Sequence, residues 1–100
     1  MTEERRREAR KRVLYEVRWQ GLSGKHMARI SDLSMGGCFI DTVGRSESGE
    51  FIVFEIRQPD DSWLELRGVV ASVDPKVGFS LHFTSLTEDE QRSLALLLNT

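Results

Sequence analysis

A dense run of arginines near the N-terminus is the first feature of this chain that could bind a ligand. Residues 1–12 carry six cations and three glutamates, a net charge of +3, whereas the rest of the chain sums to −5. Within this run, Arg6 and Arg10 have an R-x-x-x-R spacing, and Arg5 and Arg7 flank the first of them. A guanidinium presents planar pairs of donors that match phosphate oxygens. The charge of this basic N-terminal arm, residues 1–12, therefore predicts an anionic partner: a phosphate ligand, a nucleic acid or a lipid headgroup. The alternative is that the arm is a solvated tail without a partner.

A second candidate is the D-L-S-M-G-G segment of residues 32–37. Asp32 only accepts hydrogen bonds when ionised, and the Ser34 hydroxyl can donate one. The paired glycines, Gly36 and Gly37, predict a tight connection with unusual backbone angles, and they would let a ligand approach the backbone. A plain β-turn, with the Asp32 side chain folded back on the backbone, is the alternative.

No motif in the sequence supports a catalytic function. Ser34 lacks the leading glycine of a nucleophile elbow, and the chain has no phosphate-binding P-loop or dinucleotide fingerprint. His26, His82 and Cys38 lack zinc-finger spacing, so no metal site is expected and the histidines are interpreted as strand or surface residues. The single cysteine permits no intrachain disulfide and is interpreted as a core residue. We expect no enzyme and no cofactor.

Length and composition indicate one soluble domain. The chain has 100 residues, of which 39% are hydrophobic and 30% charged. No apolar run is long enough to span a membrane, and the charged N-terminus does not resemble a secretory signal, so we expect a cytoplasmic protein.

The patterning between these features predicts a mainly β fold. Apolar residues alternate with polar ones over residues 13–19, and β-rich segments follow at 27–30, 38–42, 51–57, 64–73 and 79–83. Glycine- and proline-containing turns separate them, and Gly68 inside the fifth segment suggests a bulge or bend. Trp19 and Trp63 are expected to pack on strands.

The C-terminal segment changes to a helical period. Thr87 and Glu90 fit a capping box, and the leucines at 94, 97 and 98 form one stripe. We expect a helix at residues 87–98 that covers an end or edge of an antiparallel barrel or sandwich formed by residues 13–84. Part of the leucine stripe could also mediate dimers, so a monomer and a homodimer both stay open.

Together, in this order, the two motifs resemble those of the PilZ domain family, and the resemblance extends over nearly the whole chain. That family has R-x-x-x-R before the first strand and [D/N]-x-S-x-x-G about twenty residues later, matched here by Arg6, Arg10, Asp32, Ser34 and Gly37. The G-F-S-L-H-F segment at 78–83, followed by a helix, is similar to the family's typical ending. The resemblance implies a six-stranded antiparallel barrel with one C-terminal helix, which binds the bacterial second messenger cyclic di-GMP.

The chemistry of these residues suits that ligand. The guanidinium groups of Arg6 and Arg10 can meet guanine O6 and N7, stack on a purine or bind phosphate. Asp32 can accept from N1–H and N2–H₂ of guanine, and Ser34 can donate to a phosphate oxygen. Gly36 and Gly37 can present amides to an anion. Arg5 and Arg7 could hold a second, stacked ligand, or they could simply be solvated.

The expected mechanism is an order–disorder switch. The basic arm, residues 1–12, is expected to be flexible until the ligand bridges it to the 32–37 loop, and the ordered arm then offers a new surface to an unidentified partner protein. With no output domain in the chain, it would act as an adaptor. One alternative is a PilZ-like protein-interaction module that does not bind nucleotide. Nucleic-acid binding ranks last, because the acidic body would repel a long polyanion.

Overall fold

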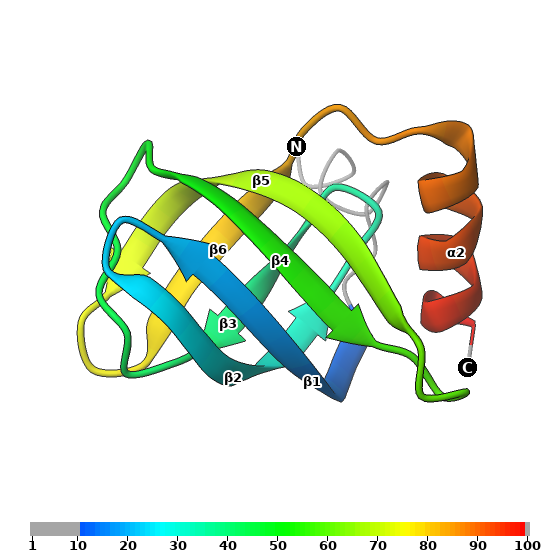
Figure 1. The fold of residues 1–100 in the computed structure, drawn as a ribbon, viewed down its shortest axis with the longest axis horizontal. Coiled ribbons are helices and arrows are strands. Elements are labelled where there is room, and N and C mark those ends of the chain that lie inside the picture. The colour runs from blue at the N-terminus through cyan, green and yellow to red at the C-terminus, as the bar shows by residue number, and fades with distance from the viewer. Residues whose placement is uncertain (1–10, 100) are drawn as a thin grey trace, which may run out of the picture.

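Six antiparallel strands close into a barrel in the computed structural model, which describes residues 11–99 (Figure 1). Around the barrel the strands follow the order β1-β2-β3-β6-β5-β4, and β4 pairs again with β1. Their bounds are β1 Lys11–Gly21, β2 Gly24–Leu33, β3 Gly37–Asp41, β4 Phe51–Arg57, β5 Trp63–Asp74 and β6 Gly78–Phe83. The helix α2 (Glu88–Leu98) lies at one end of the barrel. The predicted six-stranded barrel with a C-terminal helix is therefore confirmed.

Alternation along each strand fills the barrel interior. Val17 and Trp19 of β1, for example, are buried, whereas Glu16, Arg18 and Gln20 between and beside them are exposed. Successive side chains of a strand point to opposite faces, so this period of two separates the core from the outer surface. Cys38 is fully buried in the same core, as expected.

Turn chemistry and strand lengths differ in detail from the sequence expectation. Leu22 and Ser23 alone form the β1–β2 turn, so β2 begins at Gly24 instead of residue 27, and β1 begins at Lys11 instead of residue 13. In β5 the register shifts between Val70 and Ser72, just after Gly68, where a bulge or bend was predicted. The added Cβ of a residue at position 68 would lie 2.6 Å from the His82 carbonyl oxygen, so glycine is also needed there for close strand approach.

The helix α2 closes one end of the barrel with its leucine stripe. Leu94 and Leu97 belong to the hydrophobic core, and Leu98 packs against it. The predicted capping box is present: the Thr87 hydroxyl accepts from the Glu90 amide, and the Glu90 carboxylate accepts from the Thr87 amide. These bonds satisfy amides that the first helical turn would otherwise leave without partners.

Side chains of the barrel fasten both ends of α2. At the N-terminal end, the half-buried Arg67 donates to Glu90 at 2.6 Å. The Thr87 amide, and next the Arg67 guanidinium, lower the pKa of Glu90 below its ordinary value. At the C-terminal end, the Lys11 ammonium and the Tyr15 hydroxyl donate to the carbonyls of Leu98 and Leu97, at 2.9 and 3.1 Å. The last turn of α2 has no basic residue of its own, so Lys11 supplies the positive charge that its dipole favours.

Among residues 11–99, no helix combines the length and apolar character needed to cross a bilayer.

Candidate ligand-binding site

The 32–37 segment joins the end of β2 to the start of β3, beside the first residues of β1. Lys11 pairs with Leu33, and Arg12 pairs with Asp32. On the other side, the Gly36 carbonyl accepts from the Phe83 amide at 2.9 Å, and Gly37 pairs with His82 of β6. β1 on one side and β6 on the other thus hold this loop in one position. The chain that precedes Lys11 joins the barrel next to it.

The Ser34 side chain organises the loop from within. Its side chain is only 2% exposed, and its hydroxyl donates to the Gly37 carbonyl and accepts from the Gly36 and Gly37 amides, at 3.2–3.3 Å. The Ser34 amide also donates to the Gly37 carbonyl, at 2.9 Å. The hydroxyl and the two amides that were predicted to face an anion therefore bond to one another in this structure. Their role here is to fix the shape of the turn.

The expectation of unusual backbone angles at the paired glycines is wrong. Glycines with left-handed φ occur at 24, 49 and 78, but not at Gly36 or Gly37. Gly37 is required for a steric reason, because a Cβ there would lie 2.1 Å from the Leu81 carbonyl oxygen of β6. The missing side chain lets β3 and β6 approach closely at the point where the loop ends.

Asp32 lies on the outer surface of the barrel, between Ile30 and Leu33, which both point into the core. It is half-buried and stands between Arg12 of β1 and Phe39 of β3 in the strand register. The row continues across β6 and β5 through Ser80 and Ser72, whose hydroxyls lie 2.8 Å apart. A cation, a carboxylate, an aromatic ring and two hydroxyls thus line up across five strands.

Phe39, Ser80 and Ser72 were not predicted as site residues. The alternation of β3 and β6 already indicates that Phe39 and Ser80 share a face opposite the core, but only the register between strands brings them beside Asp32. The predicted ligand residues Arg5, Arg6, Arg7 and Arg10 lie outside the described residues.

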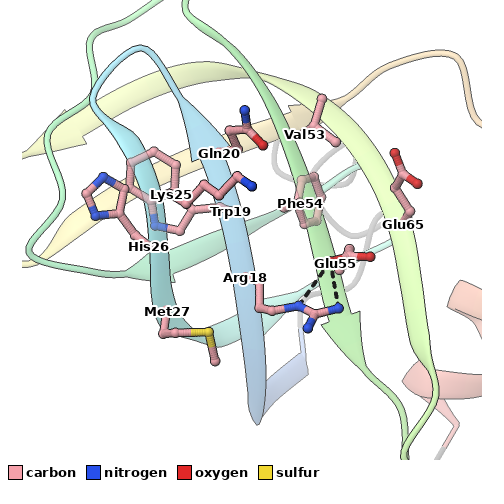
Figure 2. Close-up of a pocket in the computed structure, with 10 residues that line it drawn as sticks. All are labelled: Arg18, Trp19, Gln20, Lys25, His26, Met27, Val53, Phe54, Glu55 and Glu65. Atoms are coloured by element: carbon pink, nitrogen blue, oxygen red, sulfur yellow. Dashed lines mark hydrogen bonds and ion pairs between the residues drawn. The ribbon is translucent and has the colours of Figure 1, made fainter.

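A concavity of about 520 Å³ occupies a different part of the barrel surface (Figure 2). None of residues 32–37 lines it. Its walls come from β1, β2, β4 and β5: Arg18, Trp19, Gln20, Lys25, His26, Met27, Val53, Phe54, Glu55 and Glu65. Arg18 pairs with Glu55 there at 2.8 Å, and its guanidinium carbon lies 3.7 Å from the centre of the Trp63 ring. Two of the four charged groups that line this surface, Arg18 and Glu55, thus neutralise each other.

Comparison with known proteins identifies the family. The model of the PilZ domain matches residues 4–99, so the chain belongs to the PilZ domain family, a family of cyclic di-GMP receptor and adaptor modules. Comparison with curated protein sequences found no match.

Solved structures share the fold at low sequence identity. The inhibitor of motility MotI/DgrA of Bacillus subtilis is 24% identical, with a TM-score of 0.75 over 96% of this chain and 52% of that protein. The PilZ domain of CeSA from a cellulose-synthesizing bacterium is 17% identical, with a TM-score of 0.70 over 90% of this chain and 94% of that one. MrkH of K. pneumonia in its apo state is 18% identical, with a TM-score of 0.72 over 92% and 48%. The chain thus spans about half the length of MotI/DgrA and of MrkH.

Proposed function

We propose that this chain is a cytoplasmic cyclic di-GMP receptor that orders its N-terminal arm on binding and so signals to a partner protein. One observation carries the proposal: β1 begins beside the 32–37 loop, with Arg12 paired to Asp32 and Lys11 to Leu33. The R-x-x-x-R segment is joined covalently to that start. Its two arginines, Arg10 and Arg6, precede Lys11 by one and five positions in the chain, and Lys11 is the residue that pairs with Leu33.

The two motifs offer complementary chemistry to one ligand. Arg6 and Arg10 provide donors and charge for guanine and phosphate, and Asp32 provides an acceptor for the donor edge of guanine. Ordering the arm costs conformational entropy, which charge-assisted hydrogen bonds to the two phosphates offset. Ser34, Gly36 and Gly37 serve by holding the loop in shape, through the hydrogen bonds within the loop.

Binding at the start of β1 is linked to α2 through a short path. Lys11 follows Arg10 directly, and its ammonium holds the C-terminal carbonyl of α2. An arm that closes over the ligand would present a new surface next to this end of the helix, where Leu96 is 70% exposed. This surface is a candidate contact for the partner protein.

Isothermal titration calorimetry with cyclic di-GMP tests the receptor function. We expect saturable binding at micromolar or lower concentration, which an Arg10→Ala variant loses. Arg45→Ala is the matched control, because this exposed arginine lies near the β1–β2 turn, at the opposite end of β1 from the 32–37 loop. No binding by the unaltered chain would leave the protein-interaction module as the remaining function.

Two further measurements test the mechanism. Amide hydrogen exchange of residues 5–12 should slow on adding cyclic di-GMP, and unchanged exchange would rule out closure of the arm. The calorimetric stoichiometry distinguishes one ligand per chain from a stacked pair held with the help of Arg5 and Arg7. A ratio of one would rule out the pair.

A further inference from the structure

Two aromatic rings on the outer surface of the barrel have no role in the core. Phe39 of β3 alternates with the buried Cys38 and Ile40, and it is not among the side chains that pack against the core. His82 of β6 follows the buried Leu81 and is exposed. Among the described residues, the ring contacts involve neither of these two side chains. On the surface that carries Asp32, Phe39 is half-buried and His82 is exposed.

The register of β3 and β6 sets the spacing of the two rings. Phe39 pairs with Ser80 and Gly37 pairs with His82, so Phe39 and His82 are diagonal neighbours on adjacent strands. Diagonal neighbours in an antiparallel pair are about 7–8 Å apart. A planar base between two rings needs about 3.5–4 Å on each side, which is the contact distance of carbon atoms. The spacing therefore suits one intercalated base.

The other two corners of this four-residue unit carry no large side chain. Gly37 has no side chain, and the small Ser80 is half-buried with its hydroxyl turned to Ser72. A base between the rings would rest on backbone at position 37, where any larger residue would also clash with Leu81. The gap therefore has two aromatic walls and a nearly bare floor.

We propose that Phe39 and His82 clamp one guanine of cyclic di-GMP between them, with one edge of the base over Gly37 and its donor edge toward Asp32. The inference rests on the proposed receptor function and adds to it the two side chains that stack on the base. Asp32 borders the gap because it pairs with Phe39 from the other side, on β2. Stacking alone accepts any base, since every base has an aromatic face, whereas the carboxylate of Asp32 selects the N1–H and N2–H₂ donors of guanine.

Calorimetry with cyclic di-GMP on matched variants tests the clamp. Phe39→Leu keeps an apolar side chain but removes the ring, and we expect about tenfold weaker binding. Phe39→Tyr keeps the ring and should bind within about threefold of the unaltered chain, because its aromatic face remains. Phe51→Leu is the control: this outward phenylalanine lies on β4, across β5 from His82, and its loss should leave the affinity unchanged.

His82→Ala tests the second wall independently of folding, because the His82 side chain is exposed and supports no core contact. It should also weaken binding several-fold. If Phe39→Leu and His82→Ala both bind like the unaltered chain, the clamp is overturned while the receptor function stands. If the unaltered chain does not bind, the receptor function itself fails, so the two failures are distinguishable.

Nuclear Overhauser contacts in the complex give a direct readout. We expect contacts from the guanine H8 proton to ring protons of both Phe39 and His82. Contacts to neither ring, in a complex that forms with the affinity of the unaltered chain, would place the base elsewhere and overturn the clamp.

Discussion

Replacing Gly37 by alanine separates two reasons for a glycine at the end of the 32–37 segment, the proposed ligand-binding loop. The added Cβ would lie 2.1 Å from the Leu81 carbonyl oxygen, at least 0.9 Å closer than the 3.0 Å below which Cβ contacts essentially never occur. The obstacle is backbone, so no side chain can rotate away. The φ of Gly37 is not left-handed, and alanine is therefore not excluded by backbone conformation. The cost must come from moving β6 away from β3.

The size of that cost follows from the displacement. A hydrogen bond of about 2.9 Å lengthened by about 0.9 Å is no longer a hydrogen bond. Losing two such ladder bonds costs about 2 kcal/mol at about 1 kcal/mol each, and overpacking of this kind adds about 1–3 kcal/mol. We therefore expect a loss of about 3–5 kcal/mol in the free energy of unfolding. At about 4–8 °C per kcal/mol for a domain of this size, that lowers the melting temperature by at least about 12 °C.

Thermal unfolding without ligand, followed by circular dichroism, measures this loss. Gly24→Ala is the control: it has a φ of +112° but nothing within 4 Å of the added Cβ, so only backbone strain of about 1–2 kcal/mol is expected. If Gly37→Ala melted like the unaltered chain, and lost only cyclic di-GMP binding, the steric reasoning would be refuted and the glycine would be there for the ligand.

Three more substitutions test the anchors of α2 and the ligand site. Glu90→Gln keeps an acceptor for the Thr87 amide but removes the charge next to Arg67, so we expect about 1 kcal/mol lower stability at pH 7. The folded-state pKa of Glu90 lies below its ordinary value of 4.5, so its contribution to stability is complete above that pH and is lost as the pH falls through the lowered value. In chemical denaturation, the free energy of unfolding of the variant should therefore decline less between pH 5 and 3 than that of the unaltered chain. An equal decline for the two proteins would contradict this. Lys11→Met removes the charge at the C-terminal end of α2, which should lower the free energy of unfolding by about 0.5–1 kcal/mol. It should also speed amide exchange of the last helical turn. Unaltered exchange would show that the contact with Leu98 is not stabilising. Asp32→Lys should abolish cyclic di-GMP binding in calorimetry, whereas a variant that still binds would remove Asp32 from the site.

Local pattern determined the elements of this protein. The alternation of Val17 and Trp19 with charged neighbours separates core from surface over a few residues, and Thr87 with Glu90 specifies the start of a helix within one turn. These signals depend on the period of the backbone and on contacts between residues three or four apart, so they can be read from the chain itself. The two ligand motifs were equally visible, because they are contiguous in sequence.

Tertiary structure alone decided which of these residues meet. Alternation assigns Phe39, Ser80 and His82 to the outer face, but their distances from Asp32 depend on how β2, β3 and β6 are aligned. A shift of one residue in a strand would turn its side chains to the other face. The requirement for Gly37 likewise comes from a carbonyl 44 positions later in the chain, and the contact of Lys11 with Leu98 spans 87 positions. The first contact is set by the pairing of β3 with β6 and the second by the packing of α2 at the end of the barrel, because only the tertiary fold brings such distant segments of the chain together.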